Sequence, residues 1–129
     1  EEFHKWVGNA FGKPHRRQWD KGVDVVVNFT GGDTWVPSLK VVHRGGKILT
    51  CGATAGYDPA EDLRYIWSFE LKVLGSNGWM REDLETLIAM ISSGDLDPVV
   101  DSVLPLEDVN EAFRLLEDRE VFGKVVVKI

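Results

Sequence analysis

The sequence predicts an α/β fold built on an open sheet of parallel strands, and three observations point to it. Apolar segments rich in β-branched residues recur at 23–29, 47–51 and 70–74. Segments with helical patterns separate them, and a glycine follows each one closely. Strands that alternate with helices in this way pair in parallel through right-handed crossovers.

The elements of the first half follow from their apolar patterns. A helix is expected first, because Phe3, Trp6, Val7, Ala10 and Phe11 share one stripe before Gly12 and Pro14. The segment 23–29 has the continuous pattern of a strand covered on both faces. A helix is expected after Asp33, ending at Gly45-Gly46, and Lys47 to Cys51 reads as the next buried strand.

A short helix is expected at 61–67, and Glu70 to Leu74 reads as the third strand. The acidic residues before that helix, Asp58, Glu61 and Asp62, fit capping of its start better than an acid pair. Two helical stripes follow: Leu84, Leu87, Ile88, Ile91, and then Val109, Ala112, Phe113, Leu116. The segment 98–104 reads as extended, and 124–129 as a strand with one solvent-facing side. No linker is evident, so residues 1–129 are expected to form a single domain.

Composition excludes several function classes. The 129 residues are 43% hydrophobic and 28% charged, as in an ordinary globular protein. A net charge of −6 offers no basic surface to nucleic acid or to an anionic membrane, and no apolar run is long enough to span a bilayer. Cys51 is the single cysteine, so no internal disulfide is possible and a cytoplasmic location is expected.

Glycine-rich turns follow all three predicted strands of the first half. They are Thr30-Gly31, Cys51-Gly52-Ala53-Thr54 and Gly75-Ser76-Asn77. Each alone is most often only a turn, but parallel strands would align all three along one crevice, where such sheets bind ligands. No Gly-x-Gly-x-x-Gly motif is present to hold a pyrophosphate. Cys51 has no neighbouring histidine to act as its base, so a packed thiol is expected there and not a nucleophile.

The chain resembles a known superfamily through motifs in a fixed order. They are Gly22-Val-Asp-Val-Val-Val-Asn28, Gly31-Gly32, Arg44-Gly-Gly-Lys47, Cys51-Gly-Ala-Thr-Ala-Gly56, Leu74-Gly75-Ser76, Ser93-Gly94-Asp95-Leu96, Pro105-Leu106-Glu107 and Phe122-Gly123-Lys124. Together they are similar to the zinc-type alcohol dehydrogenases and quinone oxidoreductases, the medium-chain dehydrogenase/reductase superfamily. A narrower resemblance is to the crotonyl-CoA reductase branch, through Phe11-Gly12-Lys13, Gly56-Tyr57 and Asp62-x-Arg64-Tyr65-x-Trp67. That branch has a histidine where this chain has Asn77.

The resemblance implies the second half of a Rossmann-type doubly wound parallel sheet, followed by a C-terminal return segment toward a catalytic domain outside this chain. It implies an NAD(P)H-dependent oxidoreductase that acts on a small-molecule substrate. The implied cofactor is NADP or NAD, and these residues would supply the nicotinamide side of its site. The cofactor-binding residues would be Thr30, Gly31, Cys51, Gly52, Ala53, Thr54, Gly75, Ser76, Asn77, Phe122, Gly123 and Lys124. For Lys124, an exposed strand lysine is an equally good reading.

No catalytic residue and no metal ligand is assigned within the chain, and whether the parent enzyme holds zinc stays open. The chain alone is therefore expected to be inactive. The resemblance also implies a homodimer that pairs through the strand Glu70–Leu74 at the sheet edge. The alternative is a non-catalytic dimerisation or partner module that uses an exposed sheet edge.

Overall fold

The computed structural model describes residues 2–129, which divide into two compact units, one up to Gly78 and one from Trp79 to Ile129. Whether the 129 residues make one domain stays a prediction.

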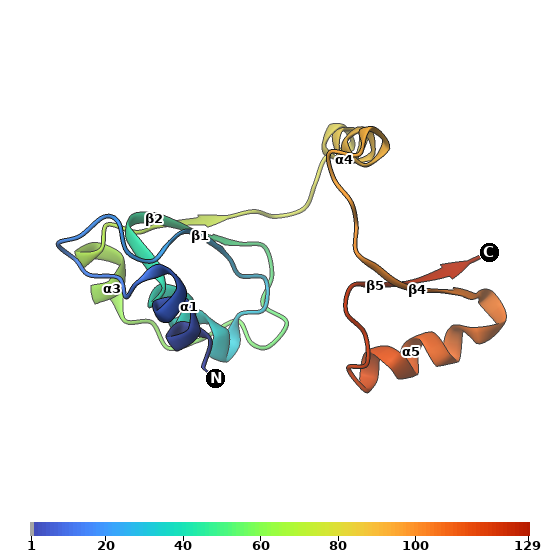
Figure 1. Cartoon of the computed structure of the whole chain (residues 1–129), viewed down its shortest axis with the longest axis horizontal. Coiled ribbons are helices and arrows are strands. Elements are labelled where there is room, and N and C mark those ends of the chain that lie inside the picture. Colours follow the sequence, from blue (N-terminus) through green and yellow to red (C-terminus); the bar gives the residue numbers. More distant parts are fainter. Residues whose placement is uncertain (1) are drawn as a thin grey trace. The chain divides into compact units, whose positions relative to one another are not determined.

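The first unit contains a three-stranded parallel sheet (Figure 1). Its strands are β1 (Val23–Val27), β2 (Val42–Thr50) and β3 (Lys72–Gly75), in the order β1-β2-β3. Val26, Ile48 and Val73 lie side by side across the three strands. The parallel pairing confirms the predicted fold class. It also places the carboxyl ends of the three strands at the same end of the sheet.

Helices cover one side of this sheet, as Figure 1 shows for α1 and α3. The helices are α1 (Phe3–Phe11), a 3₁₀ turn η1 (Gly32–Thr34), α2 (Trp35–Leu39) and α3 (Leu63–Ser68). The core consists of Leu39, Val42, Ile48 and Leu71, with Tyr65 and Phe69 packed against it. Each fully buried aliphatic side chain contributes about 1.5–3 kcal/mol relative to an exposed one, so this small core holds β2 to the helices. In the predicted stripe of α1, only Val7 is buried.

The prediction that the first strand is covered on both faces was wrong. Val26 packs toward the core, but Val25 and Val27 on the opposite face are 44% and 59% exposed. Crossovers of one hand place their helices on one side of the sheet. The other side of β1 therefore stays open within this unit.

The helix after Asp33 is shorter than predicted, because it ends at Leu39 and not at Gly45-Gly46. Val41 and Val42 are fully buried, and β2 already begins at Val42. Gly45 has a φ of +80° within β2, where the pairing with β1 changes register. A β-carbon there would lie 2.6 Å from the Trp19 ring. The glycine pair thus shapes an irregular strand and does not end a helix.

The third strand begins at Lys72 and not at Glu70. Glu70 has a φ of +53°, a left-handed conformation that interrupts an extended strand. Its carboxylate forms an ion pair with Arg44, whose guanidinium lies 4.5 Å from the centre of the Trp19 ring. These tertiary contacts determine where β3 starts.

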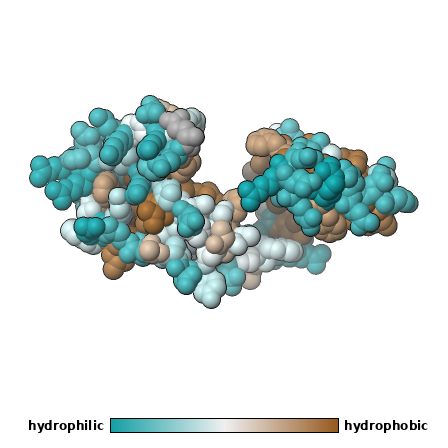
Figure 2. Space-filling model, turned by 90° about the horizontal axis from the view of Figure 1, so that it is seen from below, coloured by the Kyte–Doolittle hydropathy of each residue, from teal (hydrophilic) through white to brown (hydrophobic). Residues whose placement is uncertain are grey.

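The second unit has the helix α4 (Arg81–Ser93), which ends at the left-handed Gly94, and a parallel strand pair. The pair consists of β4 (Val100–Pro105) and β5 (Lys124–Lys128), joined through the 3₁₀ turn η2 (Leu106–Asp108) and α5 (Val109–Glu117). Burial alternates along β5, which confirms the expected solvent-facing side. Figure 2 shows hydrophobic side chains at the surface of both units. Residues 2–129 include no helix that is both long and apolar enough to cross a bilayer.

Candidate functional site at the carboxyl ends of β1 and β2

The loops that follow β1 and β2 enclose a crevice of about 320 Å³. We call it the strand-end crevice. Three of its lining residues, Gly31, Gly52 and Ala53, were predicted as cofactor-binding from the sequence. The other lining residues are Trp35, Thr50, Gly56, Tyr57, Asp58, Pro59 and Glu61. The crevice lies where parallel α/β sheets bind their ligands.

Asn28 organises the first of these loops. Its side chain is buried, and Oδ1 accepts hydrogen bonds from the backbone N–H groups of Thr30 (3.0 Å) and Gly31 (2.8 Å). Nδ2 donates to Thr34 Oγ1 at 3.0 Å and to Ser38 Oγ at 2.9 Å. One amide therefore determines the path of the Thr30-Gly31 turn and connects it to α2. A buried polar side chain that is fully hydrogen-bonded in this way makes the local structure specific.

The two loops are joined to each other by backbone hydrogen bonds. Gly32 N–H donates to the Gly56 carbonyl at 2.8 Å, and Ala55 N–H donates to the Thr30 carbonyl at 2.7 Å. Gly31 has a φ of +67°, and a β-carbon there would lie 2.4 Å from the Gly56 oxygen. Glycine is required at this position both by backbone conformation and by the close approach of the second loop.

The end of β3 lies beside the end of β2, because Ser76 N–H donates to the Thr50 carbonyl at 2.9 Å. Gly75 differs from the other glycines of the site. No atom lies within 4 Å of the position that its β-carbon would occupy. Its backbone is thus open to solvent on that side.

Several predicted site residues lie outside the lining of the crevice. Cys51 is exposed, so the expectation of a packed thiol was wrong: β2 ends one residue earlier, at Thr50, and Cys51 already belongs to the loop. Thr54 and Asn77 are also exposed. Their contact with a cofactor stays a prediction.

Phe122, Gly123 and Lys124 lie in the second unit. Lys124 N–H donates to the Val99 carbonyl at 2.9 Å, and a β-carbon on Gly123 would lie 2.5 Å from the same oxygen. Phe122 N–H donates to Asp101 at 3.0 Å. The close approach of β4 and β5 thus explains why residue 123 is a glycine. A cofactor role for the three residues stays a prediction.

Of the three acidic residues expected to cap α3, only Asp62 does so, whereas Asp58 and Glu61 line the crevice. Asp62 Oδ1 accepts from the Arg64 backbone N–H at 3.1 Å, and the Arg64 guanidinium pairs with the same carboxylate at 2.8 Å. The hydrogen bond from the Arg64 side chain lowers the pKa of Asp62 below its ordinary value of 3.8. Glu61 accepts a hydrogen bond from Trp35 Nε1. Among residues 2–129, no group of three His, Cys, Asp or Glu side chains is placed to hold a metal ion.

Three features of the crevice were not predicted from the sequence. Asn28 was recognised only as part of a motif, although an amide that ends an apolar strand is itself a signal of a buried hydrogen-bonding role. Gly56 and Tyr57 were noted for their resemblance but not assigned to the site. No sequence pattern predicted Trp35 in the crevice, because the position of its side chain depends on how α2 packs.

Comparisons with known proteins show the family of the chain. A family model described as zinc-binding dehydrogenase matches residues 5–127. The acryloyl-coenzyme A reductase of Sulfurisphaera tokodaii is 29% identical over 126 residues, which are 95% of this chain and 36% of that protein. The crotonyl-CoA carboxylase/reductase of Cereibacter sphaeroides is 30% identical over 118 residues, 86% of this chain and 27% of that protein.

Solved structures extend the likeness. An NAD-dependent alcohol dehydrogenase superposes with a TM-score of 0.78 at 35% identity, covering 98% of this chain and 35% of the other. A 2-octenoyl-CoA carboxylase reductase, in complex with NADP and 2-octenoyl-CoA, has a TM-score of 0.75 at 34% identity and covers 83% and 24%. The chain thus spans about a third of the length of several of these relatives. It belongs to the zinc-binding dehydrogenase family.

Proposed function

We propose that the protein to which this chain contributes is an NAD(P)H-dependent oxidoreductase acting on a small-molecule substrate, and that the strand-end crevice receives the nicotinamide end of the cofactor. The observation that carries the proposal is the meeting of three glycine-rich strand ends in one place, two of them lining the crevice. A relative of this fold is described in complex with NADP, and another as NAD-dependent. Bound NAD(P)H would supply the hydride.

The residues of the crevice fit such a group. Backbone is open at Gly75, and the side of the crevice toward β2 is formed by Thr50, Gly52 and Ala53, which present little side-chain bulk. Asn28 would orient the Thr30-Gly31 backbone toward the ligand. Thr54, Ser76, Asn77 and the segment 122–124 would contribute as predicted from the sequence. The described residues offer no ligand group for zinc.

Titration of the 129-residue chain with NADPH and NADH, followed by amide NMR, tests the proposal. We expect shifts at Gly31, Gly52 and Gly75 with a dissociation constant weaker than micromolar, because the chain has no glycine motif to hold the pyrophosphate. The complete enzyme should bind far more tightly. Shifts at millimolar cofactor that avoid all three glycines would place the site elsewhere.

We also propose a homodimer that pairs through residues 70–74, of which 72–74 belong to the edge strand β3. β3 contacts only β2 within the sheet, and Val73 and Leu74 are exposed. An unpaired edge with apolar side chains favours pairing with a second strand. Cytoplasmic location stays a prediction that rests on the lone cysteine.

A further inference from the structure

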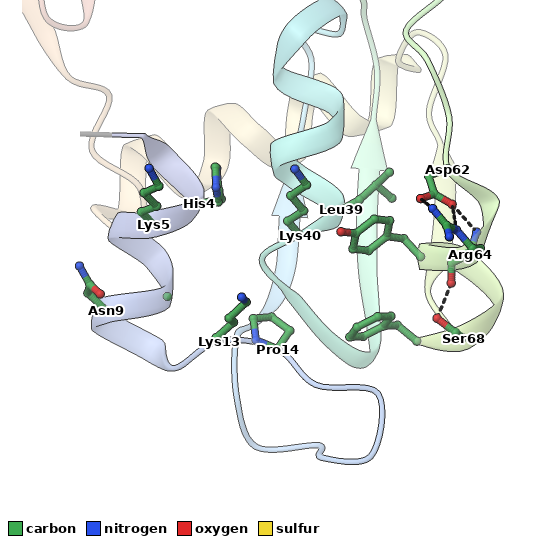
Figure 3. A pocket seen from close by; sticks show the side chains of 13 residues that line it. His4, Lys5, Asn9, Lys13, Pro14, Leu39, Lys40, Asp62, Arg64 and Ser68 are labelled. Carbon is green, nitrogen blue, oxygen red and sulfur yellow. Dashed lines mark hydrogen bonds and ion pairs between the residues drawn. The ribbon is translucent and has the colours of Figure 1, made fainter.

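We propose that the helical side of the first unit carries a second binding site, separate from the strand-end crevice, for a small organic phosphate with a flat apolar body. The site is a cleft of about 820 Å³ between α1, α2 and α3 (Figure 3). We call it the basic cleft. Its volume lies within the range of small-molecule sites, about 300–1,000 Å³.

The charge of the basic cleft opposes that of the chain. Lys5, Lys13, Lys40 and Arg64 line it against one carboxylate, Asp62, a formal excess of three positive charges (four minus one). The chain as a whole has a net charge of −6. A local excess of this sign concentrates anions in the cleft.

Two of the lining cations form ion pairs, and the Glu2 carboxylate that pairs with Lys5 also interacts electrostatically with Lys40. Lys5 lies 3.1 Å from Glu2, and Arg64 lies 2.8 Å from Asp62. Within residues 2–129, no ion pair holds Lys13 or Lys40. Figure 3 shows Lys40 just after the end of α2, between α1 on one side and the Asp62–Arg64 pair on the other, with Lys13 nearer Pro14. Ammonium groups at these places suit a phosphate, which lysine binds as a point charge.

The apolar wall of the cleft explains why the ligand should carry a flat body. Tyr65 and Phe69 both line it, and their rings are stacked with centroids 5.9 Å apart and planes 20° apart. Leu39, which is fully buried, and Pro14 add to this wall. Because Tyr65, Phe69 and Leu39 also belong to the core, the surface is formed without ligand, and binding would not need to order it.

The test uses 1-naphthyl phosphate as the probe on the whole chain, with inorganic phosphate and 1-naphthol as separate arms. Amide NMR should show saturable shifts at Gly8, Lys40 and Tyr65, and not at Gly31 or Gly52. The phosphate ester should bind at least fivefold more tightly than either component, since both charge and ring contribute. Equal binding of inorganic phosphate would overturn the flat-body part of the proposal, and equal binding of 1-naphthol the phosphate part.

Variants assign the contacts. Lys40→Gln and Lys13→Gln should each weaken binding by about fivefold, the upper end of what exposed charge pairs contribute. Lys40→Arg should largely restore affinity. The matched control is Lys47→Gln, because Lys47 is an exposed lysine of β2 outside the lining. Unchanged affinity in both glutamine variants, or amide shifts confined to the strand-end crevice, would refute the basic cleft as a binding site. Neither result would contradict the proposed cofactor site.

Discussion

Asn28 Nδ2 donates a buried hydrogen bond to Ser38 Oγ, 2.9 Å away, which ties the end of β1 to α2. Ser38 in turn donates to the Thr34 carbonyl at 2.8 Å. The turn that forms one wall of the strand-end crevice is therefore held from inside the fold by a chain of side-chain hydrogen bonds. Its shape depends on residues that need not touch a cofactor.

Replacing Asn28 tests this dependence. Asn28→Leu should lower the free energy of unfolding by about 1–3 kcal/mol, because the N–H groups of Thr30 and Gly31 lose their buried acceptor. Ser38→Ala removes a single partner of Nδ2 and should cost less, about 1 kcal/mol. Urea denaturation of the chain measures both. A cost for Asn28→Leu no larger than for Ser38→Ala would show that the turn is held by its backbone hydrogen bonds alone.

Substitutions at Gly52 and Gly75 can distinguish a role in cofactor binding from a role in stability. A β-carbon at Gly52 would lie 3.0 Å from the Phe29 carbonyl, whereas Gly75 has open space. In the complete enzyme, Gly75→Val should raise the NAD(P)H dissociation constant at least tenfold, about 1.4 kcal/mol, with little change in stability. Gly52→Val should raise it as well and also destabilise the loop.

Gly8→Ala is the matched control, since Gly8 on α1 also has no atom near its β-carbon position and lies outside the crevice. Fluorescence titration of reduced cofactor gives the dissociation constants. Normal binding by a folded Gly75→Val enzyme would remove the end of β3 from the cofactor site.

Periodicity and turn chemistry predicted much of this structure. Every strand and α-helix of residues 2–129 overlaps an expected segment, because an apolar stripe or an apolar run records which face is buried, although the start of β2 was expected to be helical. The boundaries that failed depend on contacts distant in sequence. Gly45 stays inside β2 because Trp19 and Phe69 pack around it, and Glu70 leaves the strand where Arg44 binds it.

The candidate site, too, could be predicted from the sequence only in part. Glycines at strand ends predicted Gly31 and Gly52, since positive φ and close backbone approach both favour that residue. The walls contributed by Trp35 and Tyr57 require the loop of β2 to fold back over η1, which no local pattern specifies. Asn28 was predictable in part. Its position at the end of an apolar strand could be read from the sequence, but its four hydrogen-bond partners could not.

Protonation of Asp62 should loosen the start of α3. The lowered pKa means that the folded state favours the carboxylate, so the stabilisation is present above the ordinary value of 3.8 and is lost as the pH falls through the folded pKa. An NMR titration should place the Asp62 midpoint below 3.8, with the Arg64 amide shift following it. Asp62→Asn can still cap the helix but removes this titration. A midpoint at or above 3.8 would show that the pair with Arg64 does not persist in solution.

The edge strand supports a prediction about assembly. The strand β3 ends the sheet, and its segment from Phe69 to Gly75 has no proline and two charged side chains, which is little protection against pairing with another strand. Sedimentation velocity at micromolar concentration should therefore show a species near twice 14.5 kDa. Val73→Lys adds a charge to the exposed edge and should shift the chain toward monomer. The control Val103→Lys changes an exposed valine on β4, in the other unit, and should leave the dimer intact.

A clean monomer for the unsubstituted chain would contradict the pairing of residues 70–74. A dimer that Val103→Lys dissociates and Val73→Lys does not would move the interface to the second unit.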